Sequence, residues 1–205
     1  MSAAVDAPVV VLASGSPRRR ELLERYPIRL EIRPADLDES VLDGEQPEPY
    51  VRRLARAKAQ AVRSPGDVVV AADTCVVLDG EILGKPTDAA DARRMLAGLA
   101  DRTHQVITAV AVAGDGGTAV ETVRTDVTMT AIPAADLAWY AGTDEPHDKA
   151  GAYAIQGAGG RFVRRIEGSH SNVIGLPLDT VARLLRQAGV ALTGSITESE
   201  PPHPD

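Results

Sequence analysis

Cysteine and aromatic residues are scarce in this chain of 205 residues, and their scarcity excludes several kinds of protein. Cys75 is the only cysteine, so no internal disulfide framework can form, which fits a reducing cytoplasm. Aromatic residues make up 3% of the sequence, too few for a platform on which the bases of single-stranded nucleic acid stack. The net charge of −7 also argues against stable nucleic-acid binding. A polyanionic ligand therefore needs a local positive pocket.

Long apolar segments and two common nucleotide-binding fingerprints are missing as well. No apolar run approaches the roughly 20 residues that span a bilayer, and the first ten residues lack the pattern of a signal peptide. We therefore expect a cytoplasmic protein that does not bind membranes. No G-x-G-x-x-G follows the first predicted strand, and "GEILGKPT" (80–87) has the wrong spacing for a phosphate-binding P-loop. Lys85 in that segment can still meet a phosphate as a point charge.

The order of apolar patterns predicts a mixed α/β fold. A helix is expected to begin at Pro17, and Asp79-Gly80 and "GDGG" (114–117) are typical of hairpins. Thr87 is the expected cap of the helix that ends near Leu99. Further strands are expected at 9–12, 28–34, 68–72, 75–78, 104–113, 118–130 and 163–166. Further helices are expected at 47–62, 133–140 and 177–188. We expect one domain over residues 1–192 and a disordered tail over 193–205, which has no apolar period.

The stretch "VLASGSPRRREL" (11–22) concentrates positive charge where a strand gives way to a helix. Ser16 and Pro17 are typical of a helix start, because a capping hydroxyl precedes proline at the first helical position. Ser14, Arg18 and Arg19 would add hydroxyl and guanidinium donors for an anion. The alternative is a capped surface helix with solvated arginines, and the arginine triplet alone does not decide between the two.

A single carboxylate interrupts the apolar stretch "VVVAADTCVVL" (68–78). Burying Asp73 is costly unless it has a partner. One interpretation places it at a strand end or bulge, where it caps a turn. The other places it at the mouth of the sheet, where it binds a metal or orients water. The apolar flanks favour the second interpretation, and the neighbouring hydroxyl of Thr74 supports it.

The densest polar stretch runs from residue 144 to residue 178. Gln156 in this stretch has both donor and acceptor faces, which suits the edge of a nucleotide base. Its alternative is an ordinary polar residue beside a turn. The histidines have no zinc-ligand spacing, and we expect them on the surface or in loops. They are His104, His147, His170 and His203.

Taken together, these stretches resemble the Maf family of nucleoside triphosphate pyrophosphatases. The resemblance spans about residues 9–189 and rests on segments in family order: "LASGSPRRRELL", "ARAKA", "AADT", "LGKP", "HQVITAV", "DEPHDKAGAYAIQGAGG" and "GSHSNVIGLPL". It implies an elongated, curved mixed sheet flanked by helices, with a central nucleotide-binding cleft, and a homodimer. It also implies a hydrolase of acid anhydrides, which converts a nucleoside triphosphate to the monophosphate and pyrophosphate with Mg²⁺ or Mn²⁺.

The resemblance also assigns roles to residues. Asp73 corresponds to the catalytic aspartate and, with Glu39, to the acidic positions that would hold the metal. The positions implied for substrate specificity are Arg18, Thr74 and Gln156. The positions implied for phosphate binding are Ser14, Arg19, Lys58 and Lys85. Arg20 lies where the family varies, and we expect it to face solvent.

The segment "DKAGAYAIQG" (148–157) resembles the branch of the family that acts on dTTP and UTP. The branch that acts on 7-methyl-GTP usually has a glutamate in place of Gln156. We therefore expect dTTP, UTP and modified pyrimidine nucleotides as substrates, whose hydrolysis keeps them out of nucleic acid. Two alternatives stay open: a nucleotide-binding regulator of cell division that acts through a protein partner, and a phosphatase that releases single phosphates.

Overall fold

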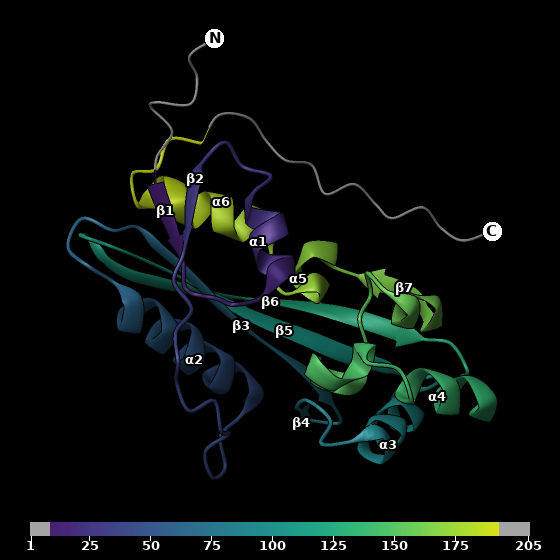
Figure 1. Cartoon of the computed structure of the whole chain (residues 1–205). Coiled ribbons are helices and arrows are strands. Elements are labelled where there is room, and N and C mark those ends of the chain that lie inside the picture. Colours follow the sequence, from purple (N-terminus) through teal and green to yellow (C-terminus); the bar gives the residue numbers. More distant parts are fainter. Residues whose placement is uncertain (1–8, 193–205) are drawn as a thin grey trace.

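A seven-stranded mixed sheet runs through residues 9–192, the part of the chain that the computed structural model describes (Figure 1). The strand order is β2-β1-β3-β5-β6-β7, and β4 pairs with β3 outside this path. β1 is parallel to β2 and β3, and the other pairs are antiparallel. The prediction of a mixed α/β fold is therefore confirmed. The predicted tail at 193–205 lies outside the described residues.

The strands and helices have the following bounds. The strands are β1 (Val9–Leu12), β2 (Arg29–Ile32), β3 (Val69–Leu78), β4 (Glu81–Leu83), β5 (Thr103–Gly114), β6 (Gly117–Met129) and β7 (Val163–Glu167). The α-helices are α1 (Pro17–Leu23), α2 (Pro47–Val62), α3 (Ala89–Leu99), α4 (Ala134–Ala141), α5 (His170–Ile174) and α6 (Leu178–Gln187). Three short 3₁₀ helices lie between α4 and β7: η1 (Glu145–Asp148), η2 (Ala150–Ala152) and η3 (Ala158–Phe162).

Helices cover both faces of the central strands, because apolar residues of β3 point alternately to either side. Val70 and Ala72 pack in one apolar cluster with α1 and α6. Val69 and Ala71 pack in another cluster with α2, on the opposite face. Figure 1 shows α2 on one side of the sheet and α1 and α6 on the other. A third cluster joins α3 and α4 to the first residues of β5 and the last residues of β6.

Both predicted hairpins are present. β4 folds back on β3 through Asp79 and Gly80, whose φ angles of 52° and 85° are both positive, as a tight hairpin turn of the I′ type requires. β5 and β6 pair along their whole length, from Thr103 opposite Thr128 to Gly114 opposite Gly117. Their β-branched residues suit a long pleated ribbon.

Three predictions from the sequence are wrong or incomplete. β3 is not interrupted at Asp73 and Thr74 but runs through them. Asp88, not Thr87, caps α3, because its side chain accepts a hydrogen bond from the backbone N–H of Asp91. Ser16 does precede α1, but its side chain makes no capping hydrogen bond.

Candidate active site

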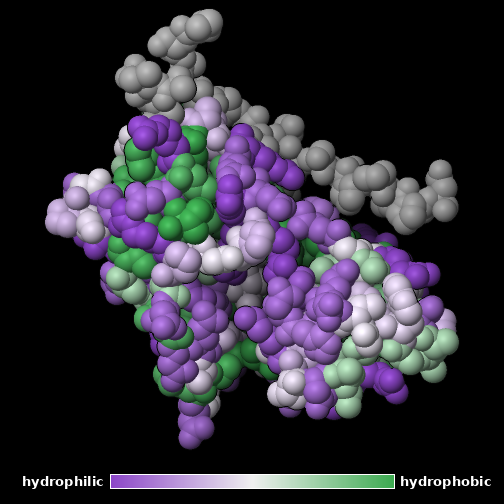
Figure 2. Space-filling view, in the orientation of Figure 1, coloured by the Kyte–Doolittle hydropathy of each residue, from purple (hydrophilic) through white to green (hydrophobic). Residues whose placement is uncertain are grey.

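The candidate site is a cavity of about 400 Å³ where one edge of β3 is left open. On β3, β1 pairs only with Val69 and Val70, and β4 pairs only with residues from Val76 to the end of the strand. Within residues 9–192, no strand pairs with this edge of β3 between them. Figure 2 shows a hollow between the part of the molecule with α2 and the part with α3 and α4, in mainly hydrophilic surroundings. All nine predicted site residues line the cavity: Ser14, Arg18, Arg19, Glu39, Lys58, Asp73, Thr74, Lys85 and Gln156.

Asp73 points from β3 toward α2, where it meets a lysine. Lys58 belongs to the buried stripe of α2, and its Nζ donates a hydrogen bond to Asp73 Oδ1 over 2.6 Å. The side chains of both residues are only 8% exposed. The same Nζ lies 2.7 Å from Oε1 of Glu39, which reaches it from the exposed loop between β2 and α2. Lys58 thus holds two carboxylates at one point of the cavity.

The two carboxylates on Lys58 differ in acidity. Burial raises the pKa of Asp73 above its usual 3.8, although the charges of Lys58 and Arg19 oppose the rise. Partial burial also works against the ionisation of Glu39, but the hydrogen bond and charge of Lys58 outweigh it, and the pKa of Glu39 is lowered. Asp73 is therefore the stronger base of the two, since its environment favours the uptake of a proton.

Thr74 points to the opposite face of β3 and meets Arg19 of α1. The guanidinium of Arg19 donates from Nη2 to Thr74 Oγ1 (3.0 Å), from Nε to the carbonyl of Gly175 (2.9 Å) and from Nη1 to Ser14 Oγ (3.4 Å). Gly175 has a φ of 118°, which side chains rarely permit. Burial lowers the pKa of Arg19, yet arginine stays charged in proteins. Three contacts therefore fix one cation beside the open edge of β3.

The remaining arginines of α1 have different surroundings. Arg18 Nη1 lies 3.8 Å from Oδ2 of Asp148, inside the cavity. Arg20 is exposed and pairs with Glu24 over 2.7 Å, as expected of a solvent-facing charge. Ser14 Oγ accepts hydrogen bonds from the backbone N–H of Ser16 and from Arg19. Neither contact uses the hydroxyl proton of Ser14, which could be donated to an anion. The positive charge of "PRRR" is thus divided between cavity and solvent.

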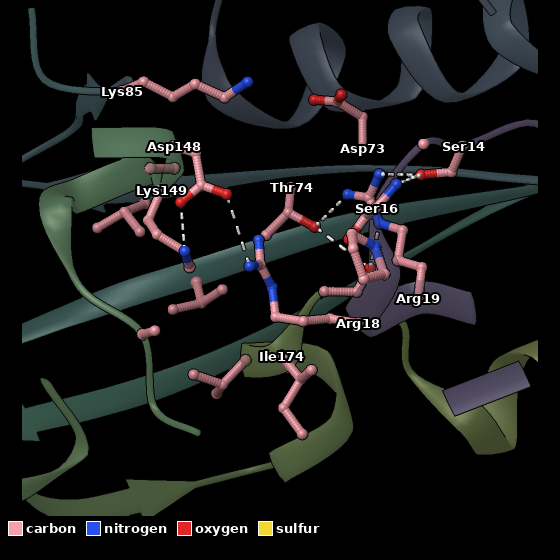
Figure 3. A pocket seen from close by; sticks show the side chains of 18 of the residues that line it. Ser14, Ser16, Arg18, Arg19, Asp73, Thr74, Lys85, Asp148, Lys149 and Ile174 are labelled. Carbon is pink, nitrogen blue, oxygen red and sulfur yellow. Dashed lines mark hydrogen bonds and ion pairs between the residues drawn. The ribbon is translucent and has the colours of Figure 1, made fainter. Parts of the chain in front are cut away.

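Two lining residues that we did not predict are Asp148 and Lys149. Asp148 contacts both Arg18 and Lys149, and Lys149 Nζ also donates to the carbonyl of Glu145 over 3.1 Å. Figure 3 shows this group on one side of the cavity, with Lys85 extending toward Asp73 on the other. The polar stretch that contains Gln156 was the available signal for both residues, since they lie within it.

The prediction that the histidines lie on the surface or in loops is wrong for His104, a buried residue of β5. Its Nε2 lies 2.7 Å from the hydroxyl of Tyr153, whose side chain lines the cavity. Burial lowers the pKa of His104 to about 4, so the ring is neutral at pH 7. His147 is exposed and His170 half-buried, while His203 lies outside the described residues.

The donor set of the cavity fits a Mg²⁺ or Mn²⁺ ion only in part. In the described part of the chain, no group of three or more His, Cys, Asp or Glu side chains could hold a metal ion. Glu39 and Asp73 supply two carboxylates at one point, through their shared contact with Lys58. Mg²⁺ is commonly bound by one or two carboxylates together with substrate phosphates and waters. The pair therefore fits a metal that arrives with a phosphorylated ligand.

None of the helices within residues 9–192 is long and apolar enough to cross a membrane.

The chain is similar to curated proteins over nearly its whole length. A protein named dTTP/UTP pyrophosphatase from Anaeromyxobacter dehalogenans is 58% identical over 91% of this chain and 97% of its own length. Proteins of the same name from Myxococcus xanthus and Methylobacillus flagellatus are 53% and 52% identical, each over 91% of this chain and 96% of its own length. Among solved structures, the Staphylococcus aureus Ham1 protein has a TM-score of 0.46 and 16% identity, over 87% of this chain and 98% of that one. The family model described as Maf-like protein matches residues 9–188, and the chain therefore belongs to the Maf family.

Proposed function

We propose that this chain hydrolyses dTTP and UTP to the nucleoside monophosphate and pyrophosphate. The observation that carries the proposal is the buried pair of Asp73 and Lys58 in a cavity that Arg18, Arg19 and Lys85 also line. A base beside several cations suits a reaction in which a polyphosphate is attacked and an anion leaves. Relatives that are 50–58% identical bear the name of this activity.

The cations would bind the triphosphate and the departing pyrophosphate. Phosphoryl transfer depends more on positioning and charge neutralisation than on covalent chemistry by the protein. Arg19 and Lys58 are held rigidly by their partners, whereas Lys85 is exposed and Arg18 half-buried. We assign the first pair to fixed charge stabilisation and the second pair to capture of the mobile phosphates. Ser14 would add a hydroxyl donor beside Arg19.

Asp73 would act on the attacking water. The water oxygen forms a bond to the α-phosphorus, the bond from that phosphorus to the bridging oxygen breaks, and pyrophosphate leaves with the bonding electrons. Asp73 accepts the water proton, for which its raised pKa suits it better than an ordinary aspartate. A divalent metal held by Asp73 and Glu39 would acidify the water and offset phosphate charge.

Gln156 would select the base. The pairing edge of uracil or thymine has one N–H donor with a carbonyl acceptor on each side of it. A glutamine side chain can both donate and accept. Gln156 is exposed and lines the cavity, so its amide is available to a ligand. Arg18 would share in this selection, as the family resemblance implies, in addition to its role in phosphate capture; it lines the same cavity.

Four further properties of the protein are part of the proposal. The catalytic unit would be a single domain over residues 1–192, a homodimer, located in the cytoplasm, and dependent on Mg²⁺ or Mn²⁺. Sedimentation equilibrium of the purified chain tests the dimer. Chelation followed by addition of each metal tests the cofactor, and activity should return with the metal that the site prefers.

The proposal is tested by a product-resolved assay across nucleoside triphosphates, with wild type and Asp73→Asn. We expect UMP or dTMP together with pyrophosphate from the wild type. Asp73→Asn should still bind nucleotide but lose turnover, since its amide cannot take up the proton. Orthophosphate as the first product would instead indicate a phosphatase. A wild type that binds nucleotides without turnover would favour the regulator of cell division.

A further inference from the structure

Thr108 is a fully buried residue of β5 (0% exposed) that lies directly opposite Thr74 in the pairing of β3 with β5. Its side chain carries no charge, and Thr108 does not line the cavity. The hydroxyl nevertheless has two hydrogen-bond partners, and one of them, Thr74, lines the cavity. Its Oγ1 lies 2.9 Å from Thr74 Oγ1 and donates to the backbone carbonyl of Asn172 over 3.2 Å.

The number of protons allows two directions for these hydrogen bonds. A carbonyl oxygen can only accept, so in the first arrangement the single hydroxyl proton of Thr108 goes to Asn172. Thr74 must then donate its own proton to Thr108, and it accepts in turn from Nη2 of Arg19. The result is a chain in one direction, from the guanidinium through two hydroxyls to a buried carbonyl. Both hydroxyl protons in it are used within the protein.

The alternative direction leads to the same conclusion for Thr74. In that case Thr108 donates to Thr74, and Thr74 donates to the carbonyl of Gly175, which lies 3.5 Å away. The hydroxyl proton of Thr74 is again used within the protein, and its oxygen still accepts from Arg19. Thr74 therefore serves Arg19 in either direction, and Thr108 holds Thr74 for that purpose.

We infer that Thr108 is a positioning residue, which orients the guanidinium of Arg19 toward the substrate through the hydroxyl of Thr74. The inference rests on the proposed function, because it assigns Arg19 to the triphosphate. An arginine recognises phosphate through a planar fork of N–H donors, so rotation of that plane weakens recognition even where the charge remains. Thr108 would thus act on the reaction without touching the substrate.

The test compares Thr108→Val, which removes only the hydroxyl, with Thr108→Ser, which keeps it. We expect Thr108→Val to lower kcat/KM for UTP roughly tenfold, since Thr74 and the carbonyl of Asn172 each lose a hydrogen-bond partner, and Thr108→Ser to stay within about twofold of wild type. Thr125→Val is the matched control. Thr125 is also buried, and its hydroxyl bonds Ser169 and the side chain of Asn172 instead of Thr74.

A double-mutant cycle separates positioning from general stability. If the chain acts as a unit, Thr74→Val and Thr74→Val with Thr108→Val should lose the same activity, whereas independent effects would multiply. Multiplying losses, equal losses in Thr108→Val and Thr125→Val, or an unchanged kcat/KM in Thr108→Val would each overturn the inference. If Thr108→Val does not fold, Thr108→Ala against Thr108→Ser makes the same comparison.

Failure of the proposed function would be seen separately. If the wild type hydrolyses neither UTP nor dTTP, that proposal fails, and the same variants are compared by calorimetric titration with pyrophosphate. Thr108→Val must then weaken pyrophosphate binding about tenfold, as loss of the buried hydrogen bonds of Thr108 implies, while Thr125→Val does not. Equal affinities in wild type and Thr108→Val would overturn the inference.

Discussion

Lys58 Nζ lies 2.6 Å from Asp73 Oδ1, and both side chains are 8% exposed. A buried ion pair of this kind is weak evidence for stability, because the cost of removing both charges from water offsets their attraction. Its effect on acidity is clearer, since the charge of Lys58 lowers a pKa that burial raises. The pair therefore sets the pH at which Asp73 can act as a base.

The acid limb of the pH–rate profile should reflect Asp73. Because burial raises its pKa, the rate should fall at a pH above 3.8, the usual value for aspartate, as Asp73 takes up a proton. Lys58→Met removes the opposing cation, so the limb should move to higher pH. Lys58→Arg, which keeps the charge, is the control and should move it less. The measurement is kcat/KM for UTP against pH, and a limb that stays in place in Lys58→Met would exclude Asp73 as its source.

Arg53 should control the affinity for the divalent metal without lining the cavity. It donates to both carboxylate oxygens of Glu45 (2.6 and 2.7 Å) and to the carbonyl of Ser40 (3.0 Å), and so holds the loop that carries Glu39. Arg53→Lys should raise the half-saturating concentration of Mn²⁺ roughly tenfold, as for other residues that orient metal ligands.

Arg63→Lys is the control for this change. Arg63 has the same exposure of 33% and pairs with Asp115, neither of which lines the cavity. Its metal dependence should match that of wild type. If Arg53→Lys shows only a lower melting temperature and an unchanged response to Mn²⁺, Arg53 does not act on Glu39.

Gln156→Glu should reduce the preference for uracil and thymine. A carboxylate cannot donate a hydrogen bond to a base acceptor, so we expect the ratio of kcat/KM for UTP to that for GTP to fall about tenfold or more. Gln187→Glu, the same change at the exposed end of α6, should leave the ratio unchanged. A panel of triphosphates measures it, and an unaltered ranking in Gln156→Glu would remove Gln156 from base selection.

His104 should make the fold sensitive to acid. Burial lowers its pKa from 6.5 to about 4, so between these values the unfolded chain takes up a proton that the folded chain does not. The part of the unfolding free energy that depends on neutral His104 is intact above pH 6.5. It is lost as the pH falls toward 4, for a total of about 3 kcal/mol. His104→Gln should therefore lose less unfolding free energy over this range, as urea titrations would show. The exposed His147→Gln is the control, and equal slopes in all three proteins would count against this role.

Much of the fold could be predicted from the sequence because its signals are local. The bounds of α2 match the prediction of 47–62, since proline marks its start and apolar residues recur at helical spacing. The break expected in β3 is absent because Asp73 has a partner 15 residues away, which no local pattern contains. The burial of His104 likewise depends on Tyr153, 49 residues further along the chain. α5 was missed because five residues give too short a pattern to detect.

In the candidate site, too, the residues could be predicted from the sequence, whereas their contacts could not. Residue types and spacing, with the family resemblance, brought nine side chains into consideration, and the fold gathers all nine at one cavity. The sequence could not show which atoms meet. The contact between Arg18 and Asp148 joins residues 130 positions apart, and the chain from Arg19 to Thr108 crosses a helix and two strands. Such relationships depend on topology and not on local composition.

Hydrolysis of UTP in ¹⁸O-labelled water tests the proposed reaction at its bond. If water attacks the α-phosphorus beside Asp73, the heavy oxygen is incorporated into UMP and the pyrophosphate stays unlabelled, as mass spectrometry of both products would show. Label in pyrophosphate or orthophosphate, with unlabelled nucleotide, would place the attack on another phosphorus and contradict the mechanism proposed for this site.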